Sequence, residues 1–293
     1  MFESVATPDG GHKARATNNA SAGPALRGHL HLVVAARPSG ETYRARQSFR
    51  APFHLSKPYW DGRVLQVQLV NSTAGILAGD ELELDIAVEA GAALSLTTPA
   101  AARAFMMRSG AALCRQRFVA QAGSSLEYSP ETLFPHRDTD FEQHTRVEVA
   151  AGSSVFFVDQ LAPGRVGGGE CWAWRRLRLG FEVVLDGRLL LRERLDASGA
   201  ELARVAAFHG MGEAWFGTAV IAVPALTADS PVWALVRALN REGSLCGVTA
   251  LAPGVWIVRL VAPTGLLLRD RLTELRRVVA EVMPALRSDL RKL

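Results

Sequence analysis

Apolar and polar residues alternate with a period of two along most of the chain from Leu26 onward, which is the pattern of strands with one face in a core. The pattern predicts a mainly β protein with strands at residues 28–35, 42–49, 63–70, 81–89, 93–98, 112–120, 125–129, 143–150, 154–159, 174–185, 188–195, 201–208, 215–223, 246–251 and 255–261. Two C-terminal helices are predicted near 231–241 and 264–280, because Ser230 and Thr264 are suitable N-caps. Residues 1–25 are mostly small and polar and predict a disordered tail, which leaves 26–293 as a single β domain.

An internal repeat indicates how these strands are arranged. The segment VEAGAALSL at 88–96 recurs as AQAGSSLEY at 120–128 and as VAAGSSVFF at 149–157. Each copy is a strand, a tight corner at a glycine (Gly91, Gly123 or Gly152) and another strand, which suits a chain that coils through successive β layers. We therefore expect a β-helix or solenoid-like stack of sheets. The alternative is an ordinary β-sandwich whose hairpins share a glycine corner.

Three carboxylates share the parity of apolar residues that should point into the core. They are Asp80 beside the strand at 81–89, Asp159 in 154–159 and Glu193 in 188–195, and Thr98 has the same parity at the end of 93–98. A lone ionised carboxylate in an apolar interior costs several kcal/mol, so each acid must be protonated, paired, or next to water or a cation. A hydrated internal passage for a cation would satisfy all three, and oxygen ligands would hold a divalent transition ion only loosely.

A plainer interpretation of the same residues is also open. The strands end at Asp80 and Asp159, the parity lapses there, and Glu193 forms an ion pair with one of the neighbouring arginines. His29 and His31 lie one residue apart on one strand and could grip a metal, but two ligands alone make a poor site, so a surface or core role is expected for both.

Composition excludes several classes of protein. The cysteines Cys114, Cys171 and Cys246 are widely separated and form no CxxC or Cys/His cluster, which argues against a disulfide framework or a structural zinc site. No signal peptide or membrane span is visible, so we expect a cytoplasmic protein without a membrane partner. The net charge of +4 is modest and the basic residues are dispersed, which argues against a nucleic-acid partner. The common catalytic and nucleotide-binding motifs are missing as well, so no catalytic residue is assigned.

Several segments together resemble one known family. They are KPYWDG at 57–62, AGILAGDELEL at 74–84, LTTPAAAR at 96–103, LEYSPETLF at 126–134, VDQLAPGRVGGGE at 158–170 and LDGRLLLRERL at 185–195. Their order and spacing resemble those of the urease accessory protein UreD family, also called UreH, over residues 26–293.

The resemblance implies a non-catalytic β-helical scaffold with two C-terminal helices. It implies a hetero-oligomer with the accessory proteins UreF and UreG that binds apo-urease and conducts nickel through an internal tunnel to the urease active site. Nickel would be cargo in transit, with no permanently bound cofactor. The tunnel acids of the family would correspond to Asp80, Asp159 and Glu193, with Thr98 lining the gaps between them. The two helices are the expected contact for UreF.

Two rival functions remain. β-Solenoid enzymes of the secreted type act on acidic polysaccharides through exposed acids and arginines, whereas the acids singled out above are expected to point inward. The other rival is an interaction scaffold without a metal role, in which the inward acids are paired with arginine.

Overall fold

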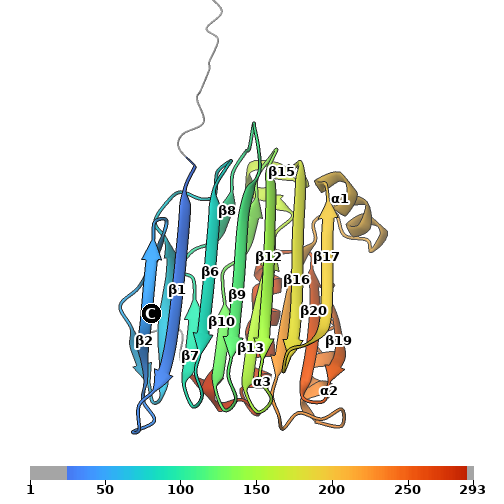
Figure 1. The fold of residues 1–293 in the computed structure, drawn as a ribbon. Helices are drawn as coiled ribbons and strands as arrows, with labels where there is room; N and C mark the ends of the chain where they lie inside the picture. The colour runs from blue at the N-terminus through green and yellow to red at the C-terminus, as the bar shows by residue number, and fades with distance from the viewer. Residues whose placement is uncertain (1–24, 289–293) are drawn as a thin grey trace, which may run out of the picture.

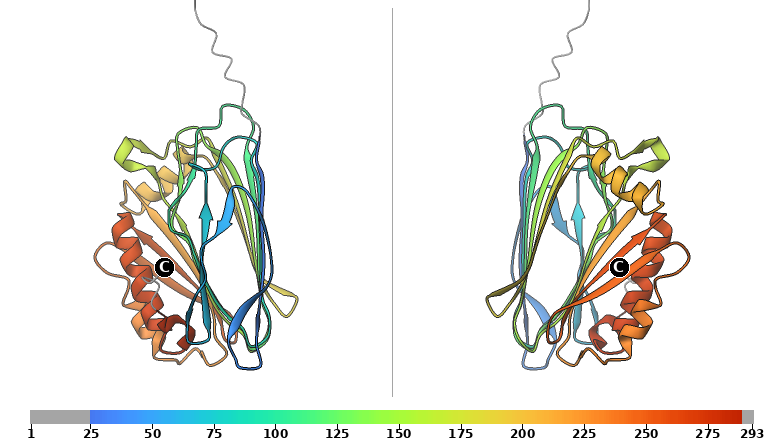
Figure 2. Two further views of the ribbon diagram at one scale, coloured as in Figure 1. Left: turned by 90° about the vertical axis from the view of Figure 1, so that its left-hand side faces the viewer. Right: turned by 90° about the vertical axis from the view of Figure 1, so that its right-hand side faces the viewer.

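The chain winds back and forth between two β-sheets that face each other, as the two edge-on views in Figure 2 show. The computed structural model describes residues 25–288, so the tail predicted at 1–25 lies, apart from its last residue, outside the described residues. A seven-stranded sheet has the order β17-β16-β12-β9-β6-β1-β2 and faces the viewer in Figure 1. Its strands are β1 (Arg27–Ala36), β2 (Thr42–Arg50), β6 (Glu81–Val88), β9 (Ala112–Ala120), β12 (Asp140–Val149), β16 (Arg176–Leu185) and β17 (Arg188–Ala197).

The second sheet has eleven strands, eight of which follow the order β19-β20-β18-β13-β10-β7-β5-β3. Its longer strands were expected from the sequence: β5 (Val64–Asn71), β7 (Ala93–Thr97), β10 (Ser125–Ser129), β13 (Ser154–Leu161), β18 (Trp215–Ala222), β19 (Leu245–Ala252) and β20 (Val255–Ala262). The short strands were not predicted, because two or three residues are too few to show a period: β3 (Phe53–Leu55), β4 (Tyr59–Asp61), β8 (Ala102–Ala104), β11 (Leu133–Pro135) and, in a separate hairpin, β14 (Gly164–Arg165) and β15 (Glu170–Cys171).

The strand pairing confirms the expected solenoid. β1, β6, β9, β12 and β16 form a continuous parallel ladder in one sheet, and β5, β7, β10 and β13 form another in the facing sheet. Successive long strands from β5 to β13 alternate between the two sheets, giving about four turns of a solenoid. The apolar residues that point inward from both ladders form the main core.

The repeated glycines form a stacked column of corners. Gly91, Gly123 and Gly152 have φ angles of +76°, +71° and +81°, a region that side-chain-bearing residues rarely adopt. The Gly123 amide donates to the Gly152 carbonyl oxygen at 3.2 Å, which joins neighbouring corners. The sequence repeat therefore marks the positions where the chain leaves one sheet for the other.

Replacing Gly123 with Ala is expected to lower the free energy of unfolding by about 1–2 kcal/mol, the cost of placing an L-residue in the left-handed region. The added methyl would meet no atom closer than 4.0 Å, so the penalty is conformational. Gly247→Ala is the matched control, since it has no positive φ and nothing within 4 Å of the new methyl. Urea titration of both variants measures the difference, and equal midpoints would show that the corner places no demand on glycine.

The described part of the chain has three α-helices, one more than predicted: α1 (Gly199–Phe208), α2 (Val232–Arg237) and α3 (Gly265–Val279). α3 confirms the prediction at 264–280, including the Thr264 cap, and α2 is shorter than the predicted 231–241. The strand predicted at 201–208 is wrong, because this segment is α1. The Ser198 side chain accepts from the Glu201 amide while the Glu201 carboxylate accepts from the Ser198 amide, and this capping box starts a helix where the short apolar alternation indicated a strand.

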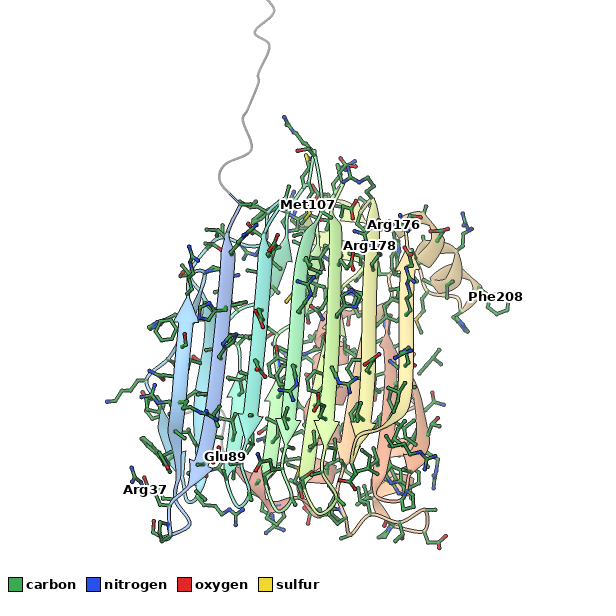
Figure 3. All side chains as sticks on the ribbon, viewed as in Figure 1. Arg37, Glu89, Met107, Arg176, Arg178 and Phe208 are labelled. Atoms are coloured by element: carbon green, nitrogen blue, oxygen red, sulfur yellow. The ribbon has the colours of Figure 1, made fainter. Side chains whose placement is uncertain are left out.

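The helices have different surroundings. α2 and α3 pack on the outer face of the eleven-stranded sheet, where a second apolar cluster forms around Trp233, Leu268 and Leu275. α1 lies beside the β17 edge and ends at Phe208, which is 87% exposed and projects outward in Figure 3. Within residues 25–288 no helix is long and apolar enough to cross a membrane.

The outer face of the seven-stranded sheet carries many charged side chains, and most of them form ion pairs with one another. Arg117 donates to both carboxylate oxygens of Glu148 at 3.0 and 3.1 Å, and Arg178 bridges Asp140 and Glu142, each at 2.9 Å. Figure 3 shows Arg178 on this face. The more exposed pairs, such as Arg117–Glu148, contribute little stability individually, but together the pairs neutralise many of the charges on this face.

Candidate functional site between the sheets

A band of polar side chains interrupts the apolar core between the two sheets. On β13, Val155 and Phe157 are buried in the main core, and Asp159 follows them on the same face. The strand continues to Leu161, so the parity does not lapse at Asp159. In the neighbouring strands, Asp159 pairs with Thr218 of β18, and Thr218 pairs with Arg259 of β20. These three residues therefore form one row across the eleven-stranded sheet.

Two cavities meet at this band. The larger, about 330 Å³, contains Thr98 and is rimmed by exposed residues of the loops after β5 and β7, among them Thr73 and Pro99. The smaller, about 260 Å³, lies at the β17 edge and is lined by Glu193, Thr218 and Arg259. Both are lined by Leu133, Gln143 and Asp159, so the two cavities adjoin at these residues, which we call the partition. We refer to the two cavities and this partition as the passage.

Asp159 is the one carboxylate at the partition. Removal from bulk water raises the pKa of its carboxyl from 3.8 to about 6, and the Gln160 amide and the Arg259 charge counteract part of this rise. Among residues 25–288, the only hydrogen bond to the side chain comes from the Gln160 amide at 3.0 Å. One carboxylate oxygen is thus free to accept a proton, a water molecule or a cation.

Glu193 lies at the outer end of the passage in an ion pair. It projects inward from β17, opposite Phe181 of β16, and the Arg259 guanidinium donates to it from the other sheet. The same guanidinium donates to the Thr218 hydroxyl at 2.5 Å. The side chains of Glu193 and Arg259 are 42% and 39% exposed, so this end of the passage is open to solvent. Glu193 is therefore paired with an arginine, as in the plainer interpretation, but the partner is Arg259, 66 residues away, and not one of the neighbouring arginines.

Thr98 and Asp80 hold nearby loops. The Thr98 hydroxyl lines the larger cavity and accepts from the Glu131 amide at 2.8 Å. Asp80 is only 3% exposed, and its two oxygens accept from the amides of Leu26 at 3.0 Å and Leu77 at 2.8 Å. It precedes β6, which begins at Glu81, and it lines neither cavity of the passage. The structure therefore brings Asp159, Glu193 and Thr98 to the passage, whereas the buried Asp80 carboxylate binds two backbone amides outside it.

Several polar residues of the passage were missed from the sequence. Gln116 of β9 donates to Gln143 of β12 at 3.3 Å, and Thr145 donates to Gln116 at 3.4 Å. Cys114 and Tyr128 also line the larger cavity, and burial raises the pKa of the Cys114 thiol to about 12 and raises the pKa of Tyr128. A signal was present, because Gln116 has the parity of the buried Cys114 and Gln143 that of the buried Phe141.

No three His, Cys, Asp or Glu side chains within residues 25–288 lie close enough together to hold a metal ion. In the passage, Asp159 lies where the two cavities adjoin and Glu193 lies at the β17 edge. His29 and His31 have ring centroids 4.8 Å apart on the outer face of β1, where His29 contacts Ser48 at 2.8 Å and His31 lies 3.6 Å from Glu83. They are on a different face from the passage.

The fold and the site define a β-solenoid scaffold with two adjoining cavities between its sheets, each lined by a few polar side chains among apolar ones. The family model of the UreD urease accessory protein matches residues 26–291, and the chain therefore belongs to this family. A urease accessory protein UreD from Opitutus terrae is 53% identical over 268 residues, covering 91% of this chain and 98% of that protein. UreD proteins from Herpetosiphon aurantiacus (30% identical, 87% and 88% covered) and Streptomyces griseus (30%, 80% and 83%) are also similar over most of their length.

Proposed function

We propose that this chain is a non-catalytic scaffold that conducts nickel through its passage to apo-urease during urease maturation. It acts in the cytoplasm in a complex with UreF and UreG. Membership in the urease accessory family supports the accessory role over an enzyme that acts on polysaccharides. The observation that carries the nickel step is the position of Asp159, a carboxylate at the partition of two cavities with one oxygen free of protein partners among the described residues.

The chemistry of the passage suits movement better than storage. Its side chains offer carboxylate, amide and hydroxyl oxygens from Asp159, Glu193, Gln143 and Thr98, which are hard ligands that a hydrated dication exchanges readily. Asp159 would take the ion at the partition and Glu193 at the β17 edge, while Thr98 lines the approach. Asp80, assigned to the same route from the sequence, would contribute by holding the loop before β6 in place.

The helical face is the proposed contact for UreF. Leu235 of α2 is 52% exposed and Leu266 of α3 is 62% exposed, on the side of the molecule away from the seven-stranded sheet. Large exposed aliphatic side chains on packed helices are suitable anchors for a protein partner.

A metal-independent scaffold is the second candidate, and the Glu193–Arg259 ion pair favours it. In that case Asp159 and Glu193 only shape the interior, and their replacement should change stability without changing how much nickel reaches urease.

Co-expression with urease and its accessory proteins tests the proposal. The full chain should co-purify with apo-urease and the accessory proteins, and urease activity at limiting nickel should require it. Equal urease activity with and without the chain would contradict an accessory role.

Glu193→Ala separates the two candidate functions. At limiting nickel this variant should lower urease activation by about three- to tenfold, because the passage loses one partly solvated carboxylate ligand. The complex should still assemble. The matched control is Glu83→Ala on the outer face of β6, which should activate urease normally. Normal activation by both variants would favour the metal-independent scaffold.

A further inference from the structure

Arg259 carries a permanent positive charge at the β17-edge end of the passage. It lies on β20 in the same row as Asp159 and Thr218, and its side chain reaches the opposite sheet. Its guanidinium is bound at both ends of its fork, by the Thr218 hydroxyl in its own sheet and by Glu193 in the facing one. The side chain thus crosses the gap between the sheets where the smaller cavity opens.

This position opposes a dication in two ways. The guanidinium is paired with the Glu193 carboxylate, so this carboxylate is not available to bind an ion at this end. The guanidinium also places a positive charge near Asp159 that acts on this carboxylate, and like charges repel each other more strongly where water is partly excluded. An arginine cannot lose its charge by deprotonation, so the obstacle ends only when the side chain moves.

The side chain has room to move. With 39% of its surface exposed, it faces solvent at the open edge, and Glu193 is exposed to a similar degree. An ion pair of this exposure is held weakly, so a competing dication or a docked protein can displace the guanidinium.

We propose that Arg259 is the gate of the passage: bound to Glu193 it closes the β17-edge end, and when it moves away it leaves the Glu193 carboxylate free to take a dication at that end. This inference rests on the proposed nickel route. It predicts that the free chain holds nickel only weakly at Glu193, and it assigns control of release to one ion pair.

Arg259→Gln tests the gate in the full chain. Glutamine can still donate to Thr218 but has no charge, so Glu193 becomes free, and nickel should bind about tenfold more tightly or better. Equilibrium dialysis against nickel, followed by metal analysis of the protein, measures the affinity. Arg259→Lys keeps the charge but lacks the fork that holds both partners, and its affinity should lie between wild type and Arg259→Gln.

A double-variant cycle shows whether the gain comes from Glu193. Glu193→Gln should change nickel affinity little in the wild-type background, where Arg259 occupies the carboxylate, and should abolish the gain in the Arg259→Gln background. If Arg259→Gln fails to fold, the same comparison in the Arg259→Lys background decides the question.

The outcomes separate the gate from the nickel route. If Asp159→Asn weakens nickel binding but neither Arg259 variant strengthens it, the gate is wrong and the route stands. If Asp159→Asn has no effect on nickel binding in any background, the route fails and the gate fails with it.

Discussion

Asp159→Asn is expected to lower the nickel delivered to urease by about tenfold or more while making the chain more stable at neutral pH. The loss of delivery follows because an amide replaces the one charged ligand at the partition of the passage, and a charge-assisted contact contributes about 1.5–3 kcal/mol. The gain in stability follows because the buried carboxylate no longer has to be ionised away from bulk water.

The pH dependence follows from the pKa of Asp159, which folding raises from 3.8 to about 6. Because the folded state binds the proton more tightly, the wild-type free energy of unfolding falls as the pH rises from about 4 to about 6, and the whole penalty remains above pH 6. Because the protein relaxes around the charge, Asp159→Asn should gain only about 1–2 kcal/mol at pH 7 and almost nothing at pH 4. Nickel binding by the wild-type chain should weaken below about pH 6, since a protonated carboxyl is a poor ligand.

Two measurements on the same variant check these expectations. Nickel content of urease after activation at limiting metal reports delivery, and urea titration at pH 7 and pH 4 reports stability. Asp85→Asn is the control, because Asp85 lies on the outer face of β6 with 40% of its side chain exposed. A variant that is less stable at pH 7 and delivers nickel normally would identify Asp159 as a structural residue.

Glu127→Ala is expected to lower the free energy of unfolding by about 3–5 kcal/mol, the usual cost of breaking a buried ion pair. Glu127 of β10 is 2% exposed and binds Arg276 of α3 through two contacts, at 2.5 and 3.1 Å. The hydroxyl of Ser95 also donates to it at 2.8 Å. The variant leaves the Arg276 guanidinium, only 20% exposed, without its carboxylate beneath α3.

Thermal or urea unfolding measures this loss, with Asp85→Ala as the control. The Arg117–Asp85 pair is 49% and 40% exposed, and its loss should cost less than about 1 kcal/mol. The double variant Glu127→Leu/Arg276→Met should recover most of the stability, because apolar side chains of similar size remove both buried charges. A loss of under 1 kcal/mol in Glu127→Ala would show that α3 is held by its apolar face alone.

The strand frame could be predicted from the sequence because inward-facing side chains of a solenoid recur with a strict period. That period placed β9 and β10 at their observed bounds, and the repeated glycines located the corners between sheets. The period failed at α1, where Ala-rich residues alternate as a strand would but follow the capping pair Ser198 and Glu201. The capping box favours a helix at this point more strongly than the short apolar alternation favours a strand.

The site could be predicted only in part, because parity reports which way a side chain points and not what it meets. Asp159 points inward as its parity indicates, but Asp80 turns to the amides of Leu26 and Leu77 just before β6 begins. Leu26 lies 54 residues away in sequence, so no local pattern could reveal this contact. The ion pair between Glu193 and Arg259 joins residues 66 positions apart on different sheets, and only the folded chain brings them together.

The central claim is that a dication travels between the two sheets past Asp159. Crystals of the chain in its accessory complex, soaked in nickel and measured on both sides of the nickel absorption edge, test it most directly. Anomalous density is expected inside the passage within coordination distance of Asp159, and it should be lost in Asp159→Asn crystals. Nickel density confined to the outer surface in both crystals would contradict the account.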